Sequence, residues 1–350
     1  MGILANPAAG RDIRRLVAQA SVFPIAEKSN MVVRILSGLG VAGVERAYMM
    51  TDSGGIAARL RRVLTNSAQS GRTRPEVIFL DMPPEDGPEA TLTAAREMIE
   101  AGVSALLVLG GDGTHRLVAR VAGEVPITAL STGTNNVFPS LREATTAGLA
   151  TGLAIAGYFD AEETTIRNKI LLVKVNGRED VALVDACVST ALWTGSKALW
   201  RPDELDQLFV TFAEADSIGL STIAALLHPV SRLDPYGLRV DLAPVGQAAT
   251  VVTAPIAPGL ILPVGVSAVQ QIRAEEVQPV RARQGVIALD GEREMEFSGD
   301  DRVTVRLDQR GPRTLRVKRV MELAAREGLL REGPIRVLAG IERSEHATQP

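Results

Sequence analysis

A glycine-rich turn around one carboxylate is the feature of this sequence best suited to chemistry. An apolar run, Ala105–Leu109, ends in Gly-Gly-Asp-Gly-Thr, and a helical pattern begins at about His115. Glycines let a backbone turn sharply against a ligand, and the N–H groups that open a helix favour an anion. Asp112 repels phosphate, so its place there makes sense if it holds Mg²⁺ or accepts a proton from a hydroxyl. The turn therefore predicts phosphoryl transfer with Asp112 as the catalytic residue.

A second polar loop, Ser-Thr-Gly-Thr-Asn-Asn at 131–136, follows the predicted strand Pro126–Leu130. Its hydroxyl and amide groups can donate hydrogen bonds without adding charge, although Asn136 would also suit a helix N-cap. A third strand end carries Asn6-Pro7, where a plain strand-to-helix turn is an equal alternative. The residues predicted to bind the phosphates of a nucleotide are Asn6, Gly110, Gly111, Gly113, Thr114, Gly133, Thr134, Asn135 and Asn136.

Strands and helices are expected to alternate through the first half of the chain, which predicts parallel βαβ units. The expected strands are 2–5, 44–50, 77–80, 105–109 and 126–130, with helices at about 28–43, 52–64, 89–101, 115 onward and 139–158. Such units form a doubly wound, mostly parallel, Rossmann-like sheet. Ligands bind outside the carboxyl ends of its strands, so the three loops should converge there.

The second half reads as a β-rich domain. Strands are expected at 170–175 and 181–188 around the turn Asn176-Gly177, and later at 238–242, 249–253, 277–280, 286–289, 295–297 and 303–307. Helices are expected from Asp203 to about Ala215, from Ile218 to about Leu227 and over 315–328. This pattern predicts an α/β nucleotide-binding domain at 1–155, a β-rich substrate and oligomerisation domain at 156–315, and a C-terminal helix with a disordered tail at 316–350.

Composition narrows the classes of function. The 350 residues include 46% hydrophobic and 23% charged residues, and the net charge of −3 gives no general signal for nucleic acid. The single cysteine, Cys187, is expected in the core and fits a reducing compartment. No signal peptide and no apolar stretch of about 20 residues is visible, which predicts a cytoplasmic protein without stable membrane association. A basic cluster at 310–319 is expected to be a solvated face, with anionic-surface binding as the alternative.

The Gly-Gly-Asp-Gly-Thr turn at 110–114 resembles the signature shared by NAD kinases, diacylglycerol kinases and sphingosine kinases. Asn6-Pro7 with Gly10 resembles the first strand end of that superfamily. The likeness runs over roughly residues 2–330 and is strongest to the NAD-kinase-related branch of acetoin catabolism X proteins. The segments that carry it are Ile3–Pro7, Gly10–Arg15, Ser131–Pro139, Ala182–Asp185 and Ile218–Ser221.

This resemblance implies an NAD kinase-like two-domain fold, ATP with Mg²⁺ as cofactors and NAD as substrate. It places Asp112 beside the ribose hydroxyl that accepts phosphate. It also makes Asp112 a candidate ligand of Mg²⁺. It also implies a homo-oligomer, a dimer or tetramer. An Asn-Glu pair that contacts the nucleotide in NAD kinases matches Val184 and Asp185, so the amide is missing. Asp290 is a second substrate-binding candidate, with a plain turn residue as its alternative.

The expected function is an ATP-dependent kinase for a hydroxyl of a nucleotide-like substrate. NAD 2′-OH is the default acceptor, which implies NADP biosynthesis and a link to acetoin catabolism. A lipid or small-alcohol kinase of the diacylglycerol kinase type is the alternative that Gly133–Asn136 favours. A nucleotide-binding regulatory protein with little turnover is another, because Val184 and the segment Thr253–Gly259 depart from the NAD-kinase pattern.

Overall fold

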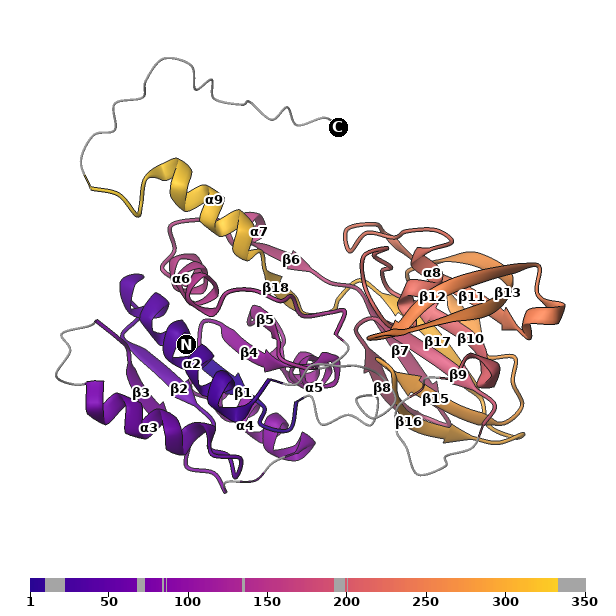
Figure 1. Cartoon of the computed structure of the whole chain (residues 1–350), viewed down its shortest axis with the longest axis horizontal. Coiled ribbons are helices and arrows are strands. Elements are labelled where there is room, and N and C mark those ends of the chain that lie inside the picture. Colours follow the sequence, from indigo (N-terminus) through magenta and orange to yellow (C-terminus); the bar gives the residue numbers. More distant parts are fainter. Residues whose placement is uncertain are drawn as a thin grey trace, which may run out of the picture.

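The computed structural model describes residues 1–9, 23–67, 73–83, 85, 87–133, 136–191, 199 and 201–332, except for the side chain of Arg293. The chain forms an α/β part and a β-rich part that lie side by side (Figure 1). The predicted motif residues Gly10–Arg15, the loop residues Thr134 and Asn135, and the tail from 333 onward lie outside the described residues.

The α/β part is built on a seven-stranded sheet of order β3-β2-β1-β4-β5-β18-β6. Its first five strands by sequence are β1 (Gly2–Ala5), β2 (Arg46–Met49), β3 (Glu76–Phe79), β4 (Leu106–Gly110) and β5 (Ile127–Ser131). They are mutually parallel, and every residue of the central β1 and β4 is buried. Strands covered on both faces lose the alternating polar pattern, which explains their continuous apolar sequence.

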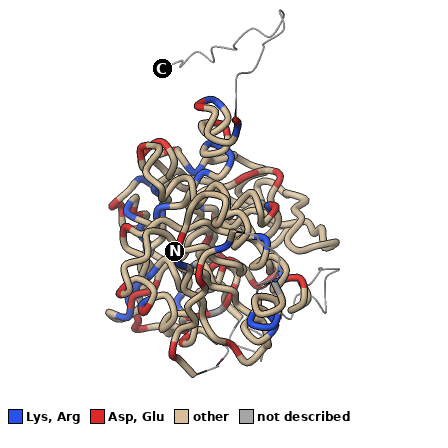
Figure 2. Tube along the Cα trace, turned by 90° about the vertical axis from the view of Figure 1, so that its left-hand side faces the viewer, with Lys and Arg blue, Asp and Glu red and all other residues tan. Residues whose placement is uncertain are grey.

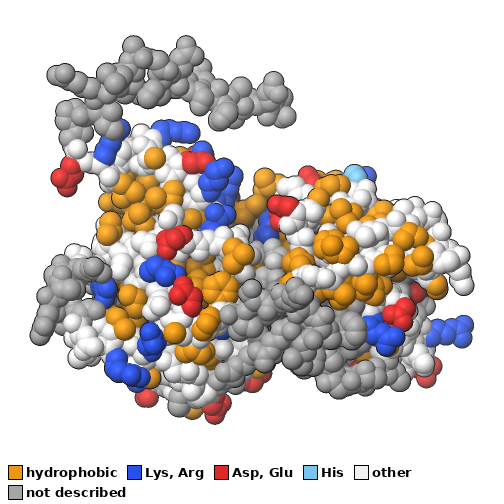
Figure 3. Space-filling model, in the orientation of Figure 1, with side chains coloured by type: hydrophobic (Ala, Val, Ile, Leu, Met, Phe, Trp, Pro, Cys, Tyr) orange, Lys and Arg blue, Asp and Glu red, His pale blue; other side chains and the backbone are white. Residues whose placement is uncertain are grey.

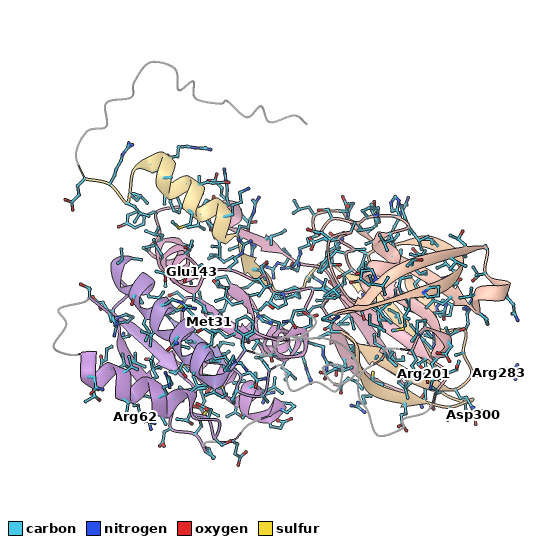
Figure 4. All side chains as sticks on the ribbon, in the orientation of Figure 1. Met31, Arg62, Glu143, Arg201, Arg283 and Asp300 are labelled. Atoms are coloured by element: carbon cyan, nitrogen blue, oxygen red, sulfur yellow. The ribbon has the colours of Figure 1, made fainter. Side chains whose placement is uncertain are left out.

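Helices cover both faces of this sheet. They are α2 (Ile25–Val41), α3 (Ile56–Ser67), α4 (Pro88–Glu100), α5 (Asp112–Ala122), α6 (Ala144–Ile155), α7 (Ala161–Thr164) and α9 (Val317–Glu327). One core joins α2, α3 and α6 to the sheet, and another joins α4 and α5 to its other face. Met31 is buried on α2, whereas Arg62 projects from the exposed side of α3 (Figure 4).

The β-rich part contains a seven-stranded antiparallel sheet of order β12-β13-β11-β10-β9-β15-β16 and a four-stranded sheet of order β14-β17-β7-β8. The strands are β7 (Ile170–Val175), β8 (Arg178–Ala182), β9 (Asp185–Ser189), β10 (Leu205–Val210), β11 (Tyr236–Ala243), β12 (Thr250–Ala257), β13 (Leu260–Arg273), β14 (Val277–Pro279), β15 (Gly285–Leu289), β16 (Glu292–Phe297) and β17 (Val303–Asp308). The short helix α8 (Ser221–Ala225) and the 3₁₀ turns η1 (Pro202–Glu204) and η2 (Val245–Gln247) join them. Cys187 is buried in this core, as expected. The α/β plus β-rich fold class is thus confirmed.

Two short strands depart from the domain boundaries predicted from the sequence. β6 (Thr165–Arg167) and β18 (Arg313–Leu315) lie in the α/β sheet, although both fall within the range 156–315. β18 runs parallel to β5, and α9 then packs on α6. The chain therefore crosses between the two parts twice, and three-residue strands are too short to show a periodic pattern.

The helix expected from Asp203 to Ala215 is wrong, because Leu205–Val210 forms the strand β10. Leu208 and Val210 enter one hydrophobic core and Phe209 enters another, so this strand is buried on both sides. An apolar run of that kind cannot be assigned to strand or helix by periodicity. The expectation also missed the long strand β13, which pairs with β11 and β12.

Acidic and basic positions are spread over the surface rather than segregated on one face (Figure 2). Among the described residues, no helix is both long enough and apolar enough to cross a membrane.

Close packing of α2 against α6 depends on glycine and yields a prediction. A Cβ added to Gly148 would lie 2.4 Å from the carbonyl oxygen of Ile35. Gly148→Ala should therefore lower the free energy of unfolding by about 2 kcal/mol, although alanine is intrinsically the better helix residue. Urea unfolding measures the change. Gly246→Ala is the control, because a Cβ there meets nothing within 4 Å. Equal or higher stability of Gly148→Ala would contradict the predicted clash.

Candidate active site at the carboxyl ends of β1, β4 and β5

The three predicted loops do converge at one edge of the sheet. The strand order reverses between β1 and β4, which makes this edge a topological switch point where open α/β sheets bind ligands. Ala5 pairs with Leu109, and Gly110 pairs with Ser131, so the chain leaves all three strands at the same level. Parallel pairing therefore brings together loops that are far apart in sequence.

Asn6 connects the loop after β1 to the glycine turn at the start of α5. Its Nδ2 donates to Thr114 Oγ1 at 2.9 Å, and its Oδ1 accepts from the N–H of Ala8 at 2.8 Å. The loop itself is held from beneath by Lys28, which is 1% exposed. Lys28 Nζ donates to the carbonyl oxygens of Asn6, Pro7 and Ala9 at 3.0, 3.1 and 2.8 Å. Sequence analysis missed Lys28, because a lysine inside a helical pattern normally faces solvent.

The glycines allow the loops to approach one another. A Cβ on Gly110 would lie 2.5 Å from Thr114 Cβ, and one on Gly111 would lie 2.9 Å from Asn136 Oδ1. A Cβ on Gly133 would lie 2.6 Å from that same oxygen and 3.0 Å from the Cα of Gly111. Gly113 has room for a side chain, since its nearest neighbour would be Glu292 at 3.8 Å. The role predicted for these glycines was close approach to a ligand, whereas the structure shows close approach between two loops.

Asp112 is the first residue of α5 and is 7% exposed. Its Oδ1 accepts the N–H of Phe138 at 2.9 Å, and its two oxygens accept the N–H of Val137 at 3.1 and 3.0 Å. The carboxylate therefore fastens the second loop to the start of α5.

The second loop forms the opposite wall. Asn136 Nδ2 donates to Ser131 Oγ at 2.7 Å, and the N–H of Thr132 donates to the carbonyl of Gly110 at 3.0 Å. The Oγ1 of Thr132 is buried and has no hydrogen-bond partner among the described residues. A buried hydroxyl in that state is costly unless water or another polar group completes its hydrogen bonding.

The side chain of His115 is fully buried, so it does not lie on a solvent-exposed face of α5. Its Nδ1 lies 2.8 Å from the carbonyl oxygen of Gly111, and its ring lies 5.9 Å from that of Phe138 between centroids. Burial lowers the pKa of His115 to about 4. The imidazole is neutral near pH 7 and acts as a packing residue beneath the glycine turn.

Arg116 links the turn to the β-rich part and was not found from the sequence. It lies one helical turn beyond Asp112, and its side chain is 5% exposed. The guanidinium lies 3.2 Å from Asp180 Oδ2, 2.7 Å from Glu294 Oε1 and 4.0 Å from Asp290 Oδ2. The sequence signal was its i, i+4 spacing from Asp112, but the partners come from strands more than 60 residues away.

Asp290, one of two predicted substrate-binding residues, is buried, and its carboxylate already accepts hydrogen bonds from the backbone. Its carboxylate accepts the N–H of Leu183 at 3.0 Å and of Val184 at 2.8 Å. Burial raises the pKa of Asp290 to about 6, against the opposing charge of Arg116. Asp185 lies beside it, because the N–H of Asp290 donates to the Asp185 carbonyl at 2.8 Å. The structure thus places the two candidates side by side, with Asp290 near Arg116 and acting as a tether for the β8–β9 corner.

Arg232 holds the second loop from the β-rich side. It donates to the carbonyl oxygens of Val137 at 2.8 Å and Phe138 at 3.1 Å. Its guanidinium also stacks on the Phe212 ring, 4.1 Å from the centroid. Val137, Phe138 and Phe212 belong to one hydrophobic cluster. The segment that Asp112 binds through N–H groups is therefore bound through its carbonyls by the other part of the chain.

No group of three or more His, Cys, Asp or Glu side chains within the described ranges is arranged to hold a metal ion. Mg²⁺ is commonly held by one or two carboxylates together with substrate phosphates, and Asp112 is the carboxylate predicted for it from the sequence.

Burial of neutral His115 makes stability depend on pH. Its pKa is about 6.5 when unfolded and about 4 when folded, so only the unfolded chain takes up a proton as pH falls through this window. The stabilisation from neutral His115 is complete above pH 6.5, and up to about 3 kcal/mol of it is lost by pH 4.

Urea unfolding at pH 7.5 and 5.0 should show that the free energy of unfolding falls less between these two pH values in His115→Asn than in the parent. The raised pKa of Asp290 acts in the opposite direction in both proteins and cancels in their difference. His228→Asn, an exposed control, should behave as the parent; equal pH dependence of all three would contradict the assignment.

Comparison with known proteins agrees with this two-part organisation. Residues 1–158 match the family described as ATP-NAD kinase N-terminal domain, and residues 169–310 match the acetoin catabolism protein X C-terminal domain. Two solved structures described as "putative diacylglycerol kinase" from Bacillus anthracis str. Sterne are also similar. One has a TM-score of 0.42 and 12% identity over 90% of this chain and 96% of that chain. The other has a TM-score of 0.40 and 13% identity over 77% and 97%.

A relative described as acetoin catabolism protein X, from Cupriavidus necator, is 45% identical over 339 residues, which cover 95% of this chain and 94% of that protein. Identity at this level over nearly both full lengths establishes kinship, and the resemblance inferred from the glycine turn and its partner loops is confirmed. The chain belongs to the acetoin catabolism protein X family.

Proposed function

We propose that this protein is a phosphotransferase that moves the γ-phosphoryl group of ATP to a hydroxyl of a nucleotide-like acceptor. The supporting observation is the junction of the three strand-end loops at the switch point, tied by Asn6 to Thr114 and by Asp112 to Val137 and Phe138. The match of residues 1–158 to the ATP-NAD kinase domain supports the same chemistry. NAD 2′-OH is the default acceptor, and the name of the Cupriavidus relative links the reaction to acetoin catabolism.

In this proposal the loops bind phosphates and Asp112 acts on the acceptor. The N–H groups that open α5 face the phosphates, as helix starts commonly do. Mg²⁺ bound with the nucleotide would supply charge neutralisation, held by Asp112 and the phosphates. A lone pair of Asp112 accepts the hydroxyl proton as the oxygen attacks phosphorus, and ADP leaves. Asn6, Thr114 and Asn136 fix the loops, so catalysis comes chiefly from positioning and electrostatics.

A second candidate is a nucleotide-binding regulator with little turnover. The observation in its favour is that Asp112 already accepts backbone N–H groups and thereby works as a structural anchor. Asp290 is committed to the β8–β9 corner in the same way. A protein of this kind would keep the nucleotide-binding site while lacking an acceptor.

The homo-oligomer and the cytoplasmic location expected in the sequence analysis remain predictions.

Asp112→Asn separates these functions. Asparagine keeps an oxygen for the N–H of Phe138 but cannot accept a proton from the acceptor. Phosphoryl transfer should fall by about 100-fold or more, whereas binding of ATP without Mg²⁺ should change little. The amide NH₂ would face the N–H of Val137, so a small loss of stability is expected and is measured separately by urea unfolding. The assay offers ATP with Mg²⁺ and either NAD, NADH, diacylglycerol or acetoin, and follows labelled phosphate on the acceptor.

Asp216→Asn, an exposed carboxylate, is the matched control and should keep full activity. Transfer to NAD that survives in Asp112→Asn would contradict the role given to Asp112. Tight ATP binding by the parent without transfer to any acceptor would establish the regulator instead. Label on diacylglycerol would move the protein to the lipid kinases.

A further inference from the structure

A cavity of about 460 Å³ lies where the start of α9 faces the β-rich part. Five of the side chains that line it are Lys or Arg, and two are Glu. In the space-filling view, basic side chains gather beside α9 and toward the junction of the two parts (Figure 3). The volume falls within the range of small-ligand pockets, roughly 300 to 1,000 Å³. The pocket is open to solvent, and an excess of positive charge of this kind suits a small anion.

Two of the five cations have no acidic partner in the part of the chain that the structure describes. Arg142, just before α6, and Arg316, just before α9, are exposed, and neither lies within 4.0 Å of a carboxylate among the described residues. Lys318 has only Glu322, at 3.8 Å on the same exposed helix face. Exposed pairs of this type contribute little, so Lys318 can turn to another anion at small cost.

The start of α9 is also electrostatically unusual. It reads Arg316-Val317-Lys318-Arg319, with no side-chain cap and no acidic residue in the first turn. The N-terminal end of a helix carries partial positive charge and favours acidic residues, so Lys318 is unfavourable there, whereas Arg319 is paired with Glu163 of α7. A bound anion would offset the repulsion between Lys318 and the helix dipole. The charge arrangement therefore supports what the cavity indicates.

The basic cluster at 310–319 is largely solvated, as expected, since Arg310, Arg316 and Lys318 are exposed, but its members have different neighbours. Arg310 binds Asp308 at 2.8 Å, and Arg313 binds Glu162 at 2.5 Å, both away from the cavity. Arg316 and Lys318 instead line the cavity. The folded structure thus divides the cluster into arginines paired away from the pocket and exposed cations that line it.

The cavity is connected to the glycine turn through Arg232. This side chain lines the cavity and also donates to the carbonyls of Val137 and Phe138. The N–H groups of those two residues bind Asp112. An anion beside Arg232 therefore lies two hydrogen-bonded steps from the Asp112 carboxylate.

We propose that this cavity is a second binding site, specific for a small soluble ligand that carries two or more phosphate groups. Arg142, Arg316 and Lys318 bind its phosphates together with the first N–H groups of α9. Binding restrains Arg232 and with it the segment 137–138. The site is separate from the nucleotide cleft, and the inference does not depend on phosphotransferase activity.

Calorimetry with inorganic tripolyphosphate, without Mg²⁺, tests the site. Arg142→Ala/Arg316→Ala should weaken the binding by about tenfold or more, because each lost cation made a charge-assisted hydrogen bond. Arg178→Ala/Arg326→Ala is the matched control: it removes two exposed arginines outside the cavity, leaves the same net charge and should bind as the parent. Equal affinity of the two double variants would overturn the proposal.

Hydrogen exchange of the full chain locates the ligand. Tripolyphosphate should slow exchange at 315–322 and 136–143 in the parent but not in Arg142→Ala/Arg316→Ala. Protection confined to 110–115 would place tripolyphosphate in the nucleotide cleft and overturn the proposal. Sedimentation of the protein with anionic phosphatidylglycerol vesicles, lost in the same variant, would assign the cations to a membrane surface and also overturn it.

Discussion

The bond between Asp112 and the backbone of Val137 and Phe138 is the constraint on which the candidate site depends. It joins the start of α5 to the loop after β5, and it leaves a carboxylate at the positive end of a helix. Arg232 binds the carbonyls of the same two residues from the β-rich part. The N–H groups and the carbonyl groups of this short segment are therefore both hydrogen-bonded. These bonds fix how the α/β part and the β-rich part are placed relative to each other.

A buried charge network reinforces this junction. Arg116 meets Asp180 and Glu294 across the boundary, while Asp290 tethers the β8–β9 corner through backbone N–H groups. Removing water from such groups is costly, so the network is weak evidence for stability by itself. It requires all partners to be present at once, and a single missing charge would leave the others buried and unpaired. Its effect is to fix how α5 faces the β-rich part.

The glycine turn gains a second purpose from this arrangement. Gly111 and Gly133 let two loops touch, and the hydroxyl of Thr132 remains buried without a partner among the described residues. Tight contact holds the two loops against each other. A preorganised site of this kind is what electrostatic catalysis or nucleotide binding needs, because the groups do not have to reorganise when the ligand arrives.

The sequence by itself determined the parallel sheet, the three strand-end loops and Asp112, because apolar runs that end in glycine and polar residues report backbone geometry locally. It could not assign β10, whose burial on both sides removes the periodic signal, or the short β18, which returns to the first sheet. Only tertiary structure decided the roles of Lys28, Arg116 and Arg232, since each is defined by partners distant in sequence. Residues that are adjacent in sequence are enough to indicate strand ends and turns, whereas buried charges form their pairs only when the chain has folded.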